Sequence, residues 1–279
     1  SLLSADLGLT SIDRLELVNY LEQEYRLDIE DTQIGPQTRV YDLRQIIVKR
    51  DRLRARDHFR FWTNSVLVRG LRMIGDAILN YPLFRIFVTL EVSGSQRLEK
   101  LGGPVIFVAN HLSYFDHPSV MFSLPKKIRY RTATAAWEEF FFGDYHGLNR
   151  LWRRLSYEYG TWLLNLFPLP QTRGFSGSLK FMGKLADSGT NILIFPEGGH
   201  SRDGKMNSFQ QGLGIIVKEL AIPVVPVKIS GTRQVLAPTE RFPKRGKVTV
   251  IFGEPLHFSF EEPGDIVARA YSEVEELNL

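Results

Sequence analysis

The sequence contains no cysteine among its 279 residues. This absence excludes a disulfide framework, a cysteine nucleophile and a thiolate metal site. Long uninterrupted apolar runs are also missing, because charges at Arg69, Arg72, Asp76 and Arg85 break the longest one, at residues 65–92. A basic-then-apolar leader pattern is not visible either. The sequence therefore predicts no membrane-spanning helix and favours a cytoplasmic location.

The composition is that of a globular protein, with 43% hydrophobic and 24% charged residues. Such a chain can bury a sizeable core, so wholly disordered and collagen-like classes are excluded. The net charge of +4 is unevenly distributed, since residues 1–48 are acidic and the remainder is strongly basic. This asymmetry predicts two units with different partners, of which the basic one faces nucleic acid or an anionic membrane surface.

The chain divides into three predicted parts. Residues 1–48 have apolar residues at helical spacing and predict a small all-helical unit, whose first helix begins near Thr10. Residues 49–92 combine a basic linker with an amphipathic helix at 59–80, which Tyr81-Pro82 is expected to end. Residues 93–279 alternate helical stretches with apolar strands, expected at 105–109, 128–134, 191–195, 224–229 and 247–252. This alternation predicts an α/β fold with a mixed, largely parallel sheet flanked by helices.

A polar motif follows the strand at 105–109 and contains Asn110, His111 and Asp116. The carboxyl end of a buried strand is where α/β folds build their sites. On one continuous helix, the His111 and Asp116 side chains would point about 140° apart. They can meet only if a turn intervenes, and the carboxylate would then leave one ring nitrogen to take a proton from a hydroxyl. The alternative is that Asp116 caps a helix and His111 is an ordinary loop residue.

A second motif follows the strand at 191–195 and contains Glu197, Gly198, Gly199 and Arg202. Adjacent glycines allow close approach of the backbone, whose N–H groups can hold a developing oxyanion. The guanidinium group of Arg202 can bind a phosphate through two hydrogen bonds. Arg173, beyond the apolar segment 167–170, offers a second guanidinium group. The alternative is a common turn with surface arginines. The proline-punctuated strand at 222–227 offers no chemistry and is expected to pack in the core.

Together these blocks resemble the glycerolipid acyltransferases, which include the glycerol-3-phosphate and 1-acylglycerol-3-phosphate acyltransferases. Residues 110–116 resemble the family's N-H-x4-D motif, residues 195–201 its F-P-E-G-x-x-S motif, and residues 222–226 its V-P-x-x-P block. The blocks occur in the family's order, and the resemblance covers about residues 101–256. It implies a glycerolipid acyltransferase-like fold for this part of the chain.

The resemblance also implies roles for individual residues. His111 is expected to be the general base and Asp116 its partner. The residues expected to hold the acceptor's phosphate and the reacting carbonyl are Asn110, Arg173, Glu197, Gly198, Gly199 and Arg202. Gly199-His200 stands where the family usually has threonine and arginine, so the arginine's phosphate contact is expected either to move to Arg202 or to be lost. No metal is implied.

The expected reaction moves a fatty acyl group to a hydroxyl of a glycerol phosphate or lysophospholipid. The donor is expected to be a phosphopantetheine thioester, either acyl-CoA or an acyl carrier protein. His111 would deprotonate the acceptor hydroxyl and return the proton to the departing thiolate, so no enzyme nucleophile is required. Ser113 is the nearest candidate for an acyl intermediate, but bonding to the loop backbone is the preferred interpretation.

The front of the chain has a resemblance of its own. Residues 6–17 resemble the L-G-x-D-S-L attachment sequence of acyl carrier proteins. This implies phosphopantetheine on Ser11, with acidic residues such as Asp13 and Glu16 facing basic partner enzymes. It further implies a partial carrier domain, cut from a longer chain that also holds acyl-activating modules. Alternatively, Thr10 and Asp13 form a capping box and Ser11 is a plain residue of the first helical turn.

Two helical stretches suggest a lipid partner. The helix at 59–80 has arginines along one face, and residues 147–167 are rich in leucine and tryptophan. Both are suited to an anionic lipid interface on the inner side of a membrane, although the second can equally pack on the protein's own core. Nucleic acid is not expected, because no recognition helix or stacking sheet accompanies the basic residues.

Two other functions remain open from the sequence. One is a catalytically silent module that binds lipid or docks a carrier protein. The other is a metal hydrolase that would use His111, Asp116, His117 and His200, although their spacing is not that of a common zinc set.

Overall fold

The computed structural model describes residues 2–25, 34–35, 37–43, 59–143, 145–170, 175–201 and 203–278. Helix α1 (Ser11–Tyr25) begins directly after Thr10, as predicted. The capping box is formed, since the Asp13 N–H donates to Thr10 Oγ1 at 3.2 Å and the Thr10 N–H donates to Asp13 Oδ2 at 2.7 Å. The N-terminal segment packs a small core of its own from Leu3, Val18, Leu21, Ile34 and Leu43. Most of the predicted basic linker lies outside the described residues.

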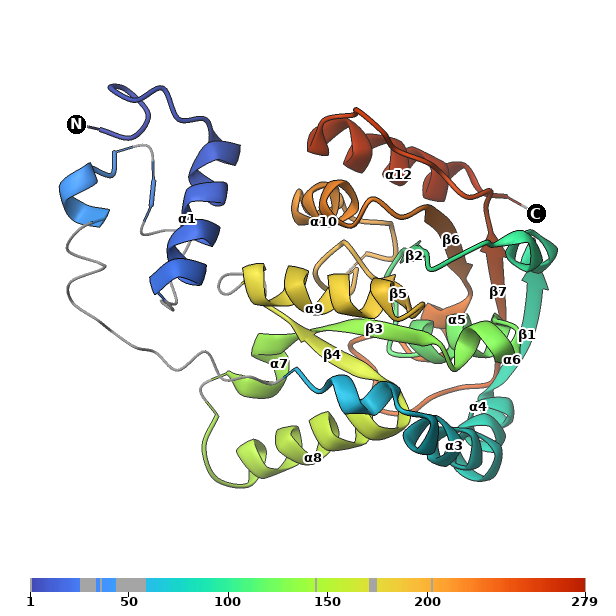
Figure 1. Ribbon diagram of the computed structural model, residues 1–279. Helices are drawn as coiled ribbons and strands as arrows, with labels where there is room; N and C mark the ends of the chain where they lie inside the picture. Colours follow the sequence, from blue (N-terminus) through green and yellow to red (C-terminus); the bar gives the residue numbers. More distant parts are fainter. Residues whose placement is uncertain are drawn as a thin grey trace.

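A seven-stranded sheet organises the rest of the molecule (Figure 1). Its strands are β1 (Val88–Ser93), β2 (Ile106–Ala109), β3 (Thr132–Trp137), β4 (Leu166–Leu169), β5 (Asn191–Ile194), β6 (Val224–Ser230) and β7 (Gly246–Phe252). The order is β1-β7-β6-β2-β5-β3-β4. All neighbouring pairs run parallel except β6 and β7. The predicted mixed, largely parallel α/β sheet is therefore confirmed.

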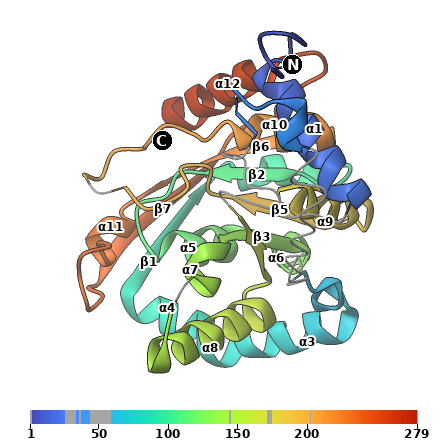
Figure 2. The ribbon, with the colours of Figure 1, turned by 90° about the vertical axis from the view of Figure 1, so that its left-hand side faces the viewer.

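Helices cover both faces of the sheet, as Figures 1 and 2 show. One face carries α9 (Phe175–Asp187), α10 (Gly212–Leu220) and α12 (Pro263–Glu276), and the other carries α4 (Tyr81–Phe87), α5 (Asp116–Ser123) and α11 (Thr232–Val235). Strand β2 shows why both faces need cover. Ile106 and Val108 pack with the first set of helices, and Phe107 and Ala109 pack with the second. Because side chains alternate along a strand, an unbroken apolar strand must be buried on both sides.

The helical run before the sheet is longer than predicted. It comprises η2 (Phe61–Asn64), α3 (Val66–Gly75), the π-helical turn η3 (Asp76–Asn80) and α4. The prediction that Tyr81-Pro82 ends it was wrong, because Pro82 lies in the first turn of α4, where its missing N–H is not needed. Helix α4 leads directly into β1, so the sheet begins before the boundary predicted between residues 92 and 93.

Two details of the strand assignment also differ from prediction. The strand expected at 128–134 begins only at Thr132, because Ile128 belongs to the short helix α6 (Lys126–Arg129) and its carbonyl accepts the Arg131 N–H at 2.9 Å. Strands β1 and β4 were not predicted. Both lie at edges of the sheet, where Pro168 of β4 is tolerated and where half-exposed residues blur the apolar pattern.

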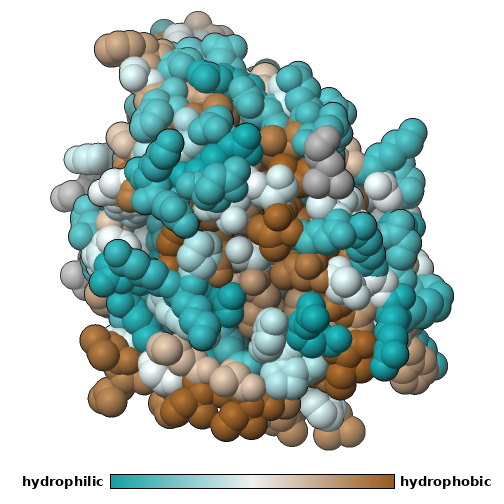
Figure 3. Space-filling view, turned by 90° about the vertical axis from the view of Figure 1, so that its right-hand side faces the viewer, coloured by the Kyte–Doolittle hydropathy of each residue, from teal (hydrophilic) through white to brown (hydrophobic). Residues whose placement is uncertain are grey.

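Helices α3 and α8 (Gly147–Leu163) contact each other and, together with η3, expose apolar side chains on one side of the molecule. We call this surface the lower apolar face; it consists of Val66, Leu67, Leu71, Ile74, Ile78, Leu148, Leu151, Trp152 and Leu155. Apolar side chains gather along the lower edge of the molecule in Figure 3. Leu67 is 83% exposed, whereas Arg72 on the same helix is only 2% exposed. Within the described part of the chain, no helix combines the length and apolarity needed to cross a bilayer.

The buried side of α3 corrects one prediction. Arg72 was expected on a face turned to lipid headgroups, but its guanidinium points inward. Its Nη2 donates to Thr63 O at 3.2 Å and to Asn165 Oδ1 at 3.1 Å, and its Nε donates to Trp162 O at 3.2 Å. Burial lowers the pKa of Arg72 to about 10, so the side chain stays charged at neutral pH. The hydrogen bonds of Arg72 therefore join the helical run to α8 and to Asn165, the residue before β4.

Candidate active site

His111 and Asp116 meet at the carboxyl end of β2. His111 lies in the loop after the strand, Asp116 is the first residue of α5, and His111 Nδ1 lies 3.0 Å from Asp116 Oδ2. The predicted intervening turn is confirmed. Asp116 is fully buried, and its Oδ2 also accepts the backbone N–H groups of Leu112 and Ser113. A carboxylate only accepts hydrogen bonds, so Nδ1 carries the proton and Nε2 is the basic nitrogen of the neutral ring.

The second motif holds the backbone of the first. Glu197 Oε1 accepts the His111 N–H at 2.7 Å, and its Oε2 accepts the Asn207 N–H at 2.8 Å. The Ser201 N–H donates to the His111 carbonyl at 3.0 Å. Glu197 is 6% exposed, and this burial raises the pKa of its carboxyl group. Both motifs therefore form one unit around His111, and Glu197 acts there by fixing the loop.

Asn110 joins the end of β2 to β6. Its Nδ2 donates to Ile229 O at 3.0 Å, and its Oδ1 accepts the Ile229 N–H at 2.7 Å. The buried amide thus acts like a backbone pair between two strands. Asn110 thereby positions the start of the His111 loop, and its predicted role in substrate binding stays a prediction.

Aromatic rings pack around His111, a contact that was not predicted from the sequence, although His200 was named there as a candidate metal ligand and Phe195 as part of the second motif. The Phe195 ring stacks on it with 4.4 Å between centroids, and the His200 ring lies 3.9 Å away. Tyr114 in turn lies 4.4 Å from His200. Burial, and secondarily the nearby His111, lowers the pKa of His200 to about 4, so that ring is neutral at physiological pH. The sequence signals were the place of Phe195 at the end of a buried strand and that of His200 in the motif that follows it.

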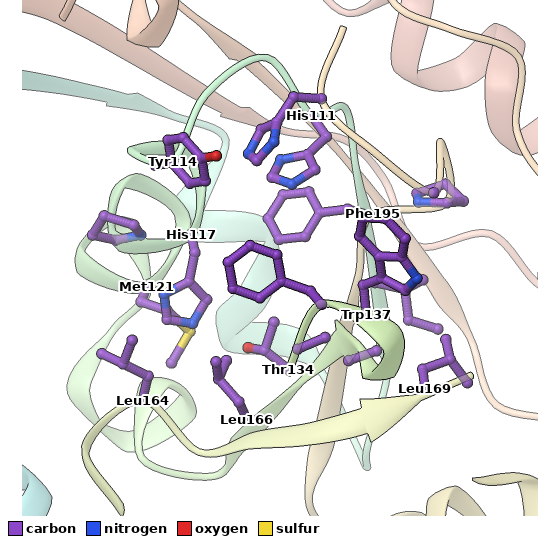
Figure 4. Close-up of a pocket in the computed structure, with 18 of the residues that line it drawn as sticks. His111, Tyr114, His117, Met121, Thr134, Trp137, Leu164, Leu166, Leu169 and Phe195 are labelled. Atoms are coloured by element: carbon purple, nitrogen blue, oxygen red, sulfur yellow. The ribbon is translucent and has the colours of Figure 1, made fainter. Parts of the chain in front are cut away.

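His111 opens onto a large cavity, shown in Figure 4. Its volume is about 1020 Å³. Gly198 and Gly199 line it near His111, and Gly198 adopts a left-handed backbone conformation (φ 72°) that favours glycine. The deeper walls are largely apolar and include Phe84, Phe115, Met121, Phe122, Leu164 and Leu166. A cavity of this size and lining suits a long hydrocarbon chain.

The remaining predicted site residues are placed as follows. Arg173 and Arg202 lie outside the described residues. The Ser113 hydroxyl accepts the Phe115 N–H at 3.1 Å, which confirms the predicted bond to the loop backbone, and it donates to Leu236 O at 2.6 Å. Ser11 is the first residue of α1 and accepts a hydrogen bond from Arg14 Nη2 at 3.1 Å.

The metal hydrolase alternative depends on a converging ligand set. Among the residues that the structure describes, no three His, Asp or Glu side chains come together in a way that would hold a metal ion. That alternative therefore lacks a ligand set in this part of the chain.

The fold and the site define an α/β protein in which a histidine–aspartate pair opens onto a long apolar cavity. Residues 89–230 match the family model described as acyltransferase, which covers half of the chain. The chain belongs to the acyltransferase family.

Individual relatives are also similar to this chain. The chloroplastic 1-acyl-sn-glycerol-3-phosphate acyltransferase LPAT1 of Arabidopsis thaliana is 26% identical over 183 residues, which cover 64% of this chain and 46% of the relative. The chain spans about half the length of the plant relatives that it matches. The bovine (Bos taurus) 1-acyl-sn-glycerol-3-phosphate acyltransferase alpha is 24% identical, with 73% of this chain and 68% of that protein covered.

A solved structure shares the fold. The crystal structure of the 1-acyl-sn-glycerophosphate (LPA) acyltransferase PlsC from Thermotoga maritima superimposes with a TM-score of 0.52 and 22% sequence identity. The match covers 96% of this chain and 98% of that one.

Proposed function

We propose that the chain transfers a fatty acyl group from a phosphopantetheine thioester to a hydroxyl of a glycerol phosphate or lysophospholipid. The observation that carries the proposal is the His111–Asp116 pair, 3.0 Å apart, at the end of an apolar cavity. The relatives' names favour 1-acylglycerol-3-phosphate as the acceptor. The site suits this reaction because it pairs a proton acceptor with room for an acyl chain.

The proposed reaction proceeds in two proton transfers. His111 Nε2 removes the proton from the acceptor hydroxyl while Asp116 stabilises the resulting imidazolium through Nδ1–H. The acceptor oxygen attacks the thioester carbon, forming the new C–O bond and a tetrahedral oxyanion. When the oxyanion collapses, the C–S bond breaks, and the departing thiolate takes the proton from His111 Nε2. The Ser113 hydroxyl is held by Leu236 O, which supports direct transfer without an acyl-enzyme.

Other predicted residues have supporting roles in this proposal. The backbone at Gly198 and Gly199 lines the cavity near His111 and is suited to the developing oxyanion. Arg173 and Arg202 are expected to hold the acceptor's phosphate, since guanidinium groups bind phosphate bidentately.

The N-terminal segment is proposed to present the acyl donor. Leu15 of α1 lines the cavity, and α1 packs against α9. Ser11 and Leu15 are four residues apart on one helix and so share a face. Phosphopantetheine on Ser11 would therefore start beside the cavity, which supports a carrier-bound thioester as donor alongside acyl-CoA.

The lower apolar face supports a peripheral location on a membrane, proposed here to be the cytoplasmic side. A contiguous apolar surface of this kind is unusual on a monomer exposed only to water. It is formed by helices that pack on the cavity-bearing domain, so a lipid acceptor would reach the site from the membrane.

The test is acyl transfer from radiolabelled acyl-CoA to 1-acylglycerol-3-phosphate presented in vesicles. His111→Ala is expected to lower kcat by about 10²- to 10⁴-fold, because it removes the general base. His257→Ala, an exposed histidine outside the cavity lining, is the matched control and should retain full activity. Equal transfer by the native chain and His111→Ala, or none by either, would favour the silent lipid-binding or carrier-docking module.

A further inference from the structure

We call the part of the cavity below His111 the chamber; two of the polar groups that line the cavity lie there and have no part in the proposed reaction. His117 Nε2 and Thr134 Oγ1 are both buried, and neither has a hydrogen-bond partner. Both residues line the cavity, whose nearby walls are apolar side chains such as Met121, Leu164 and Leu166. The two groups are therefore unsatisfied donors and acceptors that face the space where a substrate chain would lie.

The fold brings these groups together from different elements. His117 lies in the first turn of α5, next to Asp116 in the sequence. Thr134 lies in β3, where Ala133 packs in the core on one face of the sheet. Because side chains alternate along a strand, Thr134 points to the opposite side, into the chamber. Figure 4 shows the His117 ring and the Thr134 hydroxyl facing each other across the chamber, beneath His111.

An acyl chain without substituents would leave both groups unsatisfied. Burying a polar group without a partner destabilises a protein or a complex, whereas valine or phenylalanine would fill the same wall without that cost. Thr134 is 2% exposed, so bulk water does not satisfy its hydroxyl. The placement is explained if the ligand itself supplies a hydrogen-bonding atom at this depth.

The chemistry of the pair restricts what that atom can be. Burial and the nearby His111 lower the pKa of His117 to about 4, so the ring is neutral at physiological pH. The Thr134 hydroxyl can both donate and accept, and the unpartnered Nε2 of the neutral His117 ring does one or the other, according to the tautomer. Because neither group carries a charge, the pair itself suits a neutral hydroxyl better than an ionised carboxylate or phosphate, whose buried charge it would leave uncompensated.

We propose that the chamber selects acyl chains that carry a hydroxyl group in their carboxyl-proximal part, bound between His117 and Thr134. The substrate class is thus a hydroxyacyl thioester. This inference rests on the proposed acyl transfer and adds a specificity to it. His117 and Thr134 are specificity residues here and take no part in proton transfer.

The experiment compares hexadecanoyl-CoA with β-hydroxyhexadecanoyl-CoA as donors. The native chain is expected to favour the hydroxyacyl donor by about tenfold or more in kcat/KM, because a site built to bond a hydroxyl discriminates against a chain that lacks it. Thr134→Val should reduce that preference to near unity while transfer of the unsubstituted chain stays equal or rises. Thr134→Ser, which keeps the hydroxyl, should retain the preference.

Two results would overturn the inference. One is a native chain that uses both donors equally or prefers the unsubstituted one. The other is a Thr134→Val variant that loses activity on both donors to the same extent, which would indicate a structural role. His117→Phe provides an independent variant and should weaken the preference in the same direction.

A binding measurement separates this inference from the proposed function. Thermal shift with hexadecanoic and β-hydroxyhexadecanoic acid needs no catalysis. If no transfer occurs but the native chain binds the hydroxy acid more tightly, and Thr134→Val does not, the proposed transfer fails and the chamber's selectivity stands. Equal binding of both acids to the native chain would overturn the selectivity itself.

Discussion

Glu197 holds the backbone of the His111 loop from the second motif. Its two oxygens each accept a backbone N–H, from His111 and from Asn207, in a buried environment. An ionised carboxylate accepts at both oxygens, whereas an amide presents an NH₂ group at one of them. The identity of this side chain therefore matters more than its volume.

Glu197→Gln should leave one buried N–H facing an amide NH₂. We expect the free energy of unfolding to fall by about 1–3 kcal/mol and kcat to fall more than KM rises, since the His111 loop shifts. Urea unfolding and acyl transfer measure the two effects. Glu262→Gln, at an exposed glutamate, is the matched control. A Glu197→Gln chain with native stability and kcat would contradict the role of Glu197 in fixing the His111 loop.

Two histidines make stability depend on pH. The folded-state pKa values of His117 and His200 are about 4, against an ordinary 6.5. Between these values the unfolded chain binds more protons, so stability is fully present above pH 6.5 and is lost as the pH falls towards 4. The raised pKa of Glu197 acts in the opposite direction, but it is a single group.

The expected result is a melting temperature that falls as the pH is lowered from 7 to 4.5. His117→Phe should flatten this dependence, because the native His117 contributes up to about 3 kcal/mol over the window. Differential scanning calorimetry at several pH values measures the slope. An unchanged slope in His117→Phe would show that His117 is already protonated, or solvated, in the folded chain.

At the scale of elements, the lower apolar face gives a prediction about membranes. Replacing Leu67, Leu71 and Ile78 with serine should weaken binding to anionic vesicles by at least about tenfold, because apolar area no longer enters the lipid interface. The melting temperature should stay close to native, since these side chains are exposed. Vesicle co-sedimentation provides the measurement.

The control for the lower apolar face is Phe260→Ser, which removes an apolar side chain that is 95% exposed and precedes α12. Helix α12 covers the opposite side of the sheet from the lower apolar face (Figure 1). Equal loss of vesicle binding in the control and in the triple variant would argue against a specific membrane face.

The same helices show what periodicity can and cannot predict. Helical spacing identified that Leu67, Leu71 and Ile78 share a face and that Arg72 and Asp76 lie on another. It did not reveal which face is turned inward. The inward face is decided by the three groups that accept hydrogen bonds from Arg72. These are the backbone carbonyls of Thr63 and Trp162 and the side-chain oxygen of Asn165, and two of the three lie about ninety residues away in the sequence. A local pattern contains no information about such distant partners.

At the scale of the whole molecule, the N-terminal segment gives a test of the carrier proposal. Incubation with CoA and a phosphopantetheinyl transferase should add one phosphopantetheine group to Ser11, as measured by intact mass and peptide mapping. Once acylated, the arm should deliver its acyl group at a rate independent of protein concentration, because Leu15 of the same helix lines the cavity.

The variants for this test separate attachment from helix capping. Ser11→Ala should abolish the mass increase. Thr10→Ala removes the capping hydroxyl that accepts the Asp13 N–H but keeps Ser11, and should still be modified. No mass increase in the native chain would favour the capping-box interpretation of this segment.

The sequence by itself determined the local features of this protein. The apolar strands β2, β5, β6 and β7, the start of α1 and the turn between His111 and Asp116 follow from patterns within a few residues. Such features depend on backbone preferences and side-chain spacing, which neighbours along the chain decide.

Only the tertiary structure decided how distant segments combine around the site. It bonded Glu197 to the His111 backbone, engaged Asn110 with β6, packed the Phe195 and His200 rings against the His111 ring, and buried Arg72. It also set His117 opposite Thr134 in the cavity wall. The physical reason is that burial and hydrogen-bond satisfaction are settled between elements that meet only after folding, and not within the segments that carry these residues.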